Sequence, residues 1–96
     1  MQKIDIQKLD EAAEVLKAIA HPLRIAIIDL LVKKGNLTVT EIYKKLDSGQ
    51  PTISHHLSIL KSKGLLISER QGRQISYSLK HKRLNNIIKC INQCND

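Results

Sequence analysis

Residues 38–63, TVTEIYKKLDSGQPTISHHLSILKSK, predict two helices joined by a tight polar turn. Thr38 followed by Glu41 is a capping-box pattern, which opens the first helix. Pro51 favours the first position of the second helix, and Gly64 favours its end. Two helices separated by a short turn are typical of a helix–turn–helix, and this stretch predicts that motif.

The second helix of this pair has two chemically different faces. Ile53, Leu57 and Leu60 share one stripe, whereas most polar side chains lie on the opposite side and its flanks. In a helix–turn–helix the second helix enters the major groove of DNA, where hydroxyl, amide and imidazole groups bind base edges or phosphates. The residues expected to contact DNA from this motif are Thr38, Gln50, Thr52, Ser54, His55 and Ser58. His56 lies nearer the apolar stripe, so we expect it to be packed and hydrogen-bonded rather than to bind a base.

A β-hairpin is predicted directly after the helix–turn–helix. Residues 65–79 lose the helical period and alternate around Gln71-Gly72, a dipeptide typical of a hairpin turn. Three residues are expected to alternate inward, namely Ile75, Tyr77 and Leu79. The basic side chains placed to neutralise phosphates include Lys61 at the end of the preceding helix and Arg70 and Arg73 of the hairpin. A basic hairpin that follows a helix–turn–helix is typical of a winged helix.

Amphipathic helices are predicted on both sides of the winged motif. Residues 8–20 carry an apolar stripe made of Leu9, Ala12, Ala13 and Leu16. Residues 81–94 carry a second stripe made of Leu84, Ile87, Ile88 and Ile91. Residues 22–34 are apolar around most of the helix, so this helix is expected at the centre. The chain therefore predicts one mainly helical domain, residues 1–96, with a small β-hairpin and the order α-α-α-α-β-β-α.

The charge of the chain is large and unevenly distributed. Sixteen Lys and Arg residues oppose nine Asp and Glu residues, which gives a net charge of +7 on 96 residues. Residues 1–35 hold six basic and five acidic groups, whereas residues 36–96 hold ten and four. A surface for a polyanionic partner is therefore expected in the second part of the chain.

The scarcity of aromatic residues bears on which nucleic acid the chain binds. Aromatic residues make up 2% of the sequence, and Phe and Trp are absent. Single-stranded nucleic acid is usually held by bases stacked on aromatic rings, so double-stranded DNA is the expected partner. No secretory signal or membrane span of about 20 apolar residues is found, so a cytoplasmic protein without a membrane partner is expected.

Five segments stand out for their order and spacing: AHPLRI at residues 20–25, LTVTEIYKKL at 37–46, QPTISHHL at 50–57, KGLL at 63–66 and RQGR at 70–73, followed by Tyr77. Together they resemble the ArsR/SmtB family of small winged-helix transcriptional repressors. The resemblance implies a homodimer joined through the first and last helices. It also implies binding to an inverted-repeat operator in duplex DNA and release by an effector.

The best-known sensing sites of that family are not preserved in this chain. Arsenic-sensing members carry Cys-Val-Cys where this chain has Thr38-Val39-Thr40, and hydroxyls are poor ligands for a soft metalloid. Zinc-sensing members carry carboxylate and imidazole ligands on the last helix. The matching positions here include His81, Arg83 and Cys94, and a guanidinium repels a divalent cation. We therefore expect no metal or cofactor at these sites, and the effector is unknown.

Cys90 and Cys94 leave a sensing alternative open. They lie four residues apart on the last predicted helix, either as small apolar residues beside the dimer interface or as a thiol pair that binds a soft metal or is oxidised. A winged helix can also serve as a protein–protein interaction module, which is a further alternative. The sequence holds no Cys-x-x-Cys motif, catalytic triad or glycine-rich phosphate loop, so an enzyme is not expected.

Overall fold

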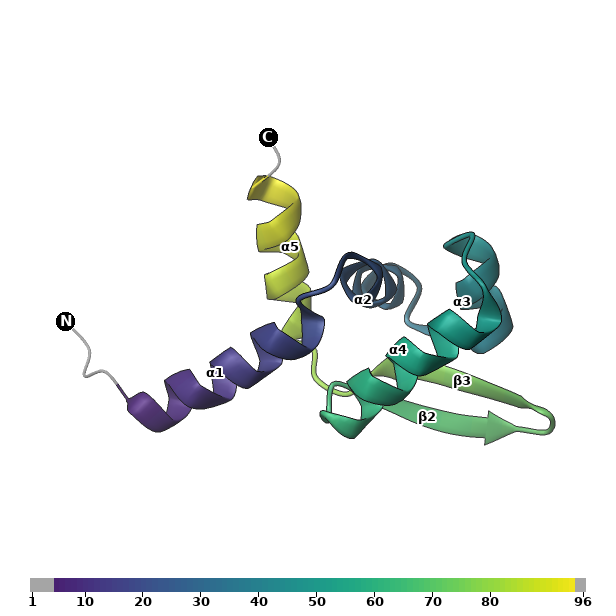
Figure 1. Cartoon of the computed structure of the whole chain (residues 1–96), viewed down its shortest axis with the longest axis horizontal. Helices are drawn as coiled ribbons and strands as arrows, with labels where there is room; N and C mark the ends of the chain where they lie inside the picture. Colours follow the sequence, from purple (N-terminus) through teal and green to yellow (C-terminus); the bar gives the residue numbers. More distant parts are fainter. Residues whose placement is uncertain (1–4, 95–96) are drawn as a thin grey trace.

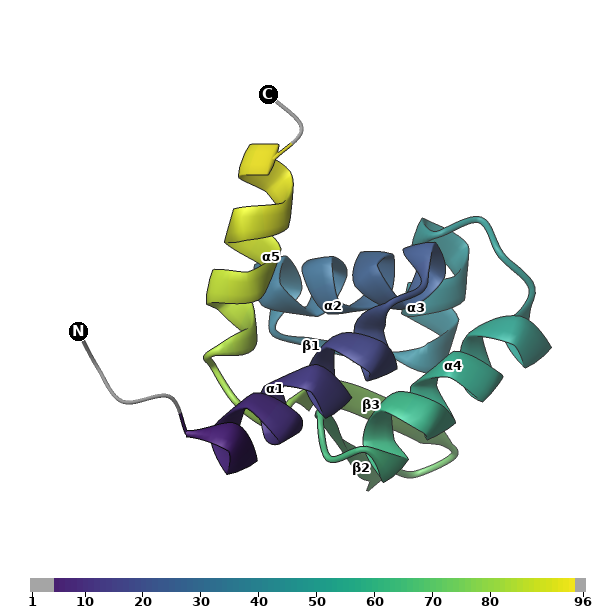
Figure 2. The same cartoon turned by 60° about the vertical axis from the view of Figure 1, so that its left-hand side comes forward.

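Five helices and three short strands make up the part of the chain that the computed structural model describes, residues 5–94 (Figures 1 and 2). The helices are α1 Ile6–Ile19, α2 Pro22–Lys34, α3 Val39–Lys45, α4 Gln50–Ser62 and α5 Leu84–Cys94. The strands are β1 Asn36–Thr38, β2 Leu66–Gln71 and β3 Gln74–Leu79. Helices α3 and α4 form the predicted helix–turn–helix, and β2 and β3 form the predicted wing, so the structure is a winged helix–turn–helix.

The helix boundaries follow from local capping interactions. Helix α2 begins at Pro22, and His21 directly before it is the capping residue. The Nδ1 atom of His21 accepts a hydrogen bond from the Leu23 amide at 3.1 Å. Thr38 and Glu41 form the predicted capping box at the start of α3. Helix α5 begins at Leu84, three residues later than predicted, because the residues before it form a turn.

The sheet contains one strand that the sequence analysis did not predict. Strands are ordered β1-β3-β2, and both pairs are antiparallel. In the register of β1 against β3, Leu37 lies opposite Tyr77. A strand of three residues is too short to show an alternating pattern, and it forms because its partner lies about forty residues downstream. The wing is therefore joined to the segment that leads into α3.

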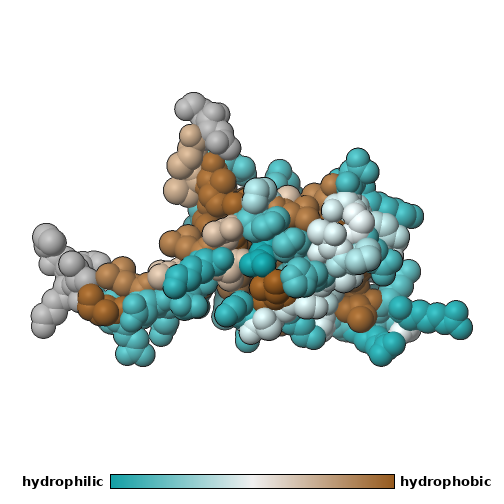
Figure 3. Space-filling view, in the orientation of Figure 1, coloured by the Kyte–Doolittle hydropathy of each residue, from teal (hydrophilic) through white to brown (hydrophobic). Residues whose placement is uncertain are grey.

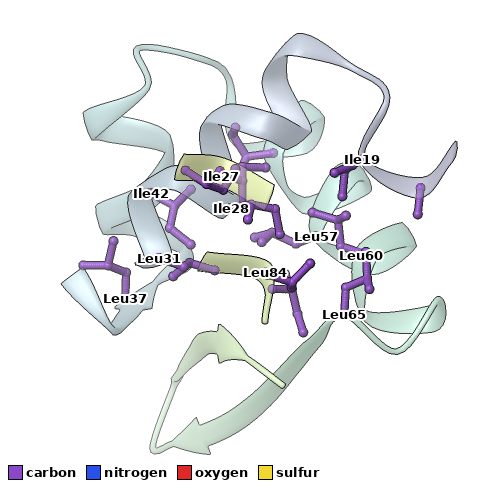
Figure 4. Packing of buried hydrophobic residues seen from close by; sticks show 14 residues of the cluster. Ile19, Ile27, Ile28, Leu31, Leu37, Ile42, Leu57, Leu60, Leu65 and Leu84 are labelled. Atoms are coloured by element: carbon purple, nitrogen blue, oxygen red, sulfur yellow. The ribbon is translucent and has the colours of Figure 1, made fainter. Parts of the chain in front are cut away.

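The hydrophobic core surrounds α2, as its apolar circumference predicted (Figure 4). Ile27, Ile28 and Leu31 of α2 are fully buried. They belong to one cluster with Ile42 of α3, three residues of α4, and Leu37, Leu65, Leu66, Leu84 and Ile88. The three residues of α4 are Ile53, Leu57 and Leu60. This packing fixes which side of α4 faces the core and leaves its polar side on the surface.

One prediction about the wing is wrong at Ile75. Tyr77 and Leu79 pack against the core, but Ile75 is 39% exposed. The register pairs Ile75 with Arg70, close to the hairpin tip, where the core cluster no longer covers the strand. The buried residue next to it is Ser76, whose hydroxyl donates a hydrogen bond of 3.4 Å to the carbonyl oxygen of Glu69.

Candidate nucleic-acid interface

Helix α4 presents a polar surface that is free of core contacts. Thr52, His55, Ser58 and Lys61 are exposed, and Ser54 is half-buried. The opposite side of the helix is held by the core, so these side chains project together from the domain. The side of α4 that sequence periodicity assigned to DNA is thus the side that the fold leaves accessible.

A groove lies between α4, the start of α3 and strand β3. Its volume is about 320 Å³. Five residues predicted to contact DNA line it: Thr38, Gln50, Ser54, Ser58 and Arg73. The groove is therefore shared by the helix–turn–helix and the wing, which are separate in sequence.

Five further lining residues were not predicted as site residues, namely Val39, Thr40, Gln74, Ile75 and Tyr77. Three of them belong to β3, and sequence periodicity alone does not show that this strand lies beside α3 and across the groove from α4. The signal that points to Thr40 was available, because it lies in the first turn of α3, two residues after the capping Thr38. The groove wall offers hydroxyl, amide and guanidinium donors together with the apolar side chain of Ile75.

The hydroxyl of Thr38 is already engaged in the fold. It accepts a hydrogen bond from the Glu41 amide at 3.2 Å and donates one to Glu41 Oε1 at 3.1 Å. The backbone N–H of Thr38 donates to the same carboxylate oxygen at 2.9 Å. The two hydrogen bonds that Thr38 donates to the Glu41 carboxylate hold the pKa of Glu41 below its ordinary value, and the backbone bond has the larger effect. Thr38 thus lines the groove chiefly as the residue that caps α3.

The wing places its two arginines differently. Arg73 lines the groove, whereas Arg70 is exposed on β2 and its Nε atom donates to the Gly72 carbonyl oxygen at 3.4 Å. Gly72 has a φ of 65°, a left-handed conformation that suits glycine, and it makes the tight turn between the strands possible. Three other residues predicted to contact DNA lie outside the groove lining, as Arg70 does, namely Thr52, His55 and Lys61.

A second groove, about 680 Å³ in volume, lies between α1 and α5 on another part of the molecule. Ala12 and Leu16 of α1 and Ile87 of α5 are among its lining residues. Leu9 and Leu16 are 54% and 55% exposed, and Figure 3 shows hydrophobic residues gathered along these two helices.

Two residues predicted for the dimer interface instead lie inside the protomer. Leu84 and Ile88 are buried, because they pack against the core cluster on the inner side of α5. The other six residues predicted for the interface are at least partly accessible in the protomer, namely Leu9, Ala12, Ala13, Leu16, Ile87 and Ile91. Ile87 and Ile91 are half-buried, so part of each side chain is still accessible.

The candidate sensing residues are at the surface. Cys90 and Cys94 are both exposed on α5 and carry free thiols. Within residues 5–94, no group of three or more His, Cys, Asp or Glu side chains is arranged to hold a metal ion. In the same part of the chain, every helix is too short or too polar to cross a membrane.

The fold and the groove define a class of protein, the winged helix–turn–helix DNA-binding proteins. The family model described as "Bacterial regulatory protein, arsR family" matches residues 21–68. The chain belongs to this family of DNA-binding transcriptional regulators, as the sequence segments indicated. Members of the family are regulators rather than enzymes.

Two relatives match nearly the whole chain. The transcriptional repressor PagR of Bacillus anthracis is 40% identical over 94% of this chain and 90% of PagR. An uncharacterised HTH-type transcriptional regulator of Methanocaldococcus jannaschii is 38% identical over 92% of this chain and 99% of its own length.

Solved structures share the fold. The crystal structure of PagR matches with a TM-score of 0.81 and 38% identity, over 91% of this chain and 99% of PagR. A homodimeric winged helix–turn–helix DNA-binding domain from Mycobacterium bovis, solved by NMR, matches with a TM-score of 0.78 and 28% identity. That match covers 100% of this chain and 91% of the other.

Proposed function

We propose that this chain is a homodimeric, sequence-specific transcriptional repressor that binds an inverted-repeat operator in double-stranded DNA. The observation that carries the proposal is the groove shared by α4 and the wing, where Gln50, Ser54, Ser58 and Arg73 lie together. The repressor role is supported by the similarity to PagR. A cytoplasmic location, where the operator is accessible, fits this role.

In this proposal α4 lies in the major groove and its exposed polar side chains contact base edges. The amide of Gln50 can pair with adenine through two hydrogen bonds, and His55 can donate to guanine. The short hydroxyl groups of Ser54 and Ser58 allow the helix to approach the bases closely. These residues are proposed to determine which sequence is bound.

The wing is proposed to supply affinity rather than sequence preference. Arg70 and Arg73 of the wing and Lys61 at the end of α4 are exposed basic side chains, and they are proposed to neutralise phosphates. Each phosphate contact adds about one unit to the slope of log affinity against log salt concentration. A phosphodiester strand that passes between α4 and the wing would lie along the groove.

Dimerisation is proposed to occur through α1 and α5. Apolar residues of these helices are exposed in the single protomer and would be buried in a dimer, and the related Mycobacterium bovis domain is a homodimer. Two-fold symmetry would place the two α4 helices one turn of DNA apart, roughly 34–36 Å, which matches an inverted repeat.

A thiol-responsive repressor is a second candidate, favoured by the exposure of Cys90 and Cys94 on the same helix. In this version, oxidation or a soft metal ion at the two thiols would release DNA. A Cys90→Ser/Cys94→Ser protein should then keep its DNA affinity in the presence of oxidant or Cd²⁺, while the wild-type protein loses it. An unchanged wild-type affinity would exclude this candidate.

The test of the proposed function starts with selection of bound sequences from a random pool of duplexes of about 30 base pairs, long enough for two half-sites. We expect an inverted repeat to be enriched. His55→Ala should then reduce discrimination between the selected and a scrambled duplex. Arg73→Ala should weaken binding to both and lower the salt slope by about one unit.

Lys89→Ala is the matched control, because Lys89 is an exposed cation on α5 and lies outside the groove. It should change neither the affinity nor the salt slope. If the His55 and Arg73 variants bind like the wild type, the assigned DNA surface is wrong, and a winged helix used for protein–protein contact becomes the better explanation.

A further inference from the structure

Arg24 joins three helices through one guanidinium group. It belongs to α2, and its Nε atom donates a hydrogen bond of 3.0 Å to Nδ1 of His56 on α4. Its Nη1 atom donates a hydrogen bond of 2.9 Å to the carbonyl oxygen of Ala18 near the end of α1. Ala18 and His56 are both buried, so these bonds lie at the junction of the three helices.

His56 is set among other basic groups. It is 7% exposed, and its ring lies 4.4 Å from the ring of His21 and 5.6 Å from that of His55. Burial lowers the pKa of His56, and the nearby charges of His21, Arg24 and His55 lower it further. The groups that act on it come from the α1–α2 junction, from α2 and from its own helix, and all of them are cationic when protonated.

The hydrogen bond between Arg24 and His56 requires a neutral imidazole. Nδ1 can accept a hydrogen bond only while it carries no proton, and a protonated imidazole is a donor at both nitrogens. The guanidinium stays charged at all relevant pH values. Protonation of His56 would therefore replace a hydrogen bond with two like charges at contact distance inside the helix junction.

We propose that Arg24 and His56 are a positioning pair that sets the orientation of α4 against the end of α1, and that protonation of His56 separates them. The inference rests on the proposed DNA-binding function and on dimerisation through α1. His55, the neighbour of His56, belongs to the proposed DNA surface, so a shift of this part of α4 displaces that surface. Because α1 contributes to the dimer interface, the same pair connects the spacing of the two α4 helices to the dimer.

The direction of the pH effect follows from linkage. A histidine with a lowered pKa in the folded protein contributes stability above its ordinary value of 6.5. That contribution is lost as the pH falls through the lowered value. DNA binding that depends on the neutral form should weaken over the same range.

The experiment compares wild-type protein with His56→Asn and Arg24→Lys, using fluorescence anisotropy on the selected duplex at about pH 8 and about pH 5.5, on either side of the ordinary histidine pKa. Asparagine at position 56 keeps an acceptor near the position of Nδ1 but does not titrate. Lysine at position 24 keeps the charge but lacks the planar fork that reaches both acceptors. Thermal denaturation at each pH shows whether each variant is folded under the conditions of the binding assay.

We expect the wild-type protein to lose affinity at the lower pH relative to His56→Asn, by a factor below the roughly tenfold limit that one pKa unit between free and DNA-bound protein sets at still lower pH. The two proteins share every other residue, so this comparison isolates the effect of position 56. Arg24→Lys should bind about fivefold more weakly than the wild type at pH 8, the net effect of one lost hydrogen bond.

Equal acid dependence of wild type and His56→Asn overturns this inference while leaving the proposed function intact. An Arg24→Lys protein that binds the duplex as tightly as the wild type at pH 8 also overturns this inference and leaves the proposed function intact. Absence of any sequence preference in DNA binding at pH 8 overturns the proposed function, and the inference with it. The two failures are therefore distinguishable in one series of measurements.

Discussion

Substitution of Leu16 tests the proposed dimer surface quantitatively. Full burial of a leucine side chain stabilises by about 1.5–3 kcal/mol, and Leu16 is 55% exposed in the single protomer. Covering that exposed part in a dimer would contribute about 0.8–1.6 kcal/mol per copy, or about 1.6–3.3 kcal/mol for the two copies that symmetry brings together. Leu16→Ala is therefore expected to raise the dimer Kd by one to two orders of magnitude, roughly, since 1.4 kcal/mol corresponds to a factor of ten.

Sedimentation equilibrium at several protein concentrations measures this change directly. Ile67→Ala is the control, because Ile67 is similarly exposed, at 48%, but lies on β2 of the wing and outside the groove between α1 and α5. The control should leave the dimer Kd unchanged. The reasoning is refuted if Leu16→Ala dimerises like the wild type, or if both substitutions weaken the dimer equally.

Substitutions at three other positions probe the fold around the DNA surface. Ile27→Ala removes a fully buried side chain from the central helix and should lower the free energy of unfolding by about 2–5 kcal/mol in urea denaturation. Thr38→Ala should cost about 1 kcal/mol, and Thr38→Ser should restore most of it. Hydrogen bonds from Thr38 lower the pKa of Glu41, so ionised Glu41 stabilises the fold above pH 4.5, and this stabilisation is lost as the pH falls through the lowered pKa. Thr38→Ala should therefore lose less stability on acidification than the wild type. Gly72→Ala strains a left-handed turn by roughly 1 kcal/mol and should speed amide exchange in the wing, without effect on exchange in α2.

Local signals made the helix–turn–helix predictable from sequence. Pro22 marked the start of α2, and Thr38 with Glu41 marked the start of α3, because capping interactions involve residues close together in the chain. The period of the apolar residues likewise predicted which side of α4 is buried. These interactions need no knowledge of distant segments.

Features that depend on distant segments were not predictable in the same way. Strand β1 forms only through its pairing with β3, so the pairing of Leu37 with Tyr77 has no local signature. The exposure of Ile75 depends on how far the wing extends beyond the core. Leu84 and Ile88 fit an amphipathic pattern, but a pattern does not distinguish a helix side that meets its own protomer from one left for a partner.

The third strand also determines how rigidly the wing is held. A two-stranded hairpin alone is only marginally stable in water, whereas a third strand with an apolar face supports it. The pairing of Leu37 and Thr38 with β3 fastens the wing to the residue that caps α3. Arg73 is therefore carried on a platform that is ordered before any ligand arrives. The conformational entropy lost on complex formation is correspondingly smaller, and the on-rate does not wait for the hairpin to form.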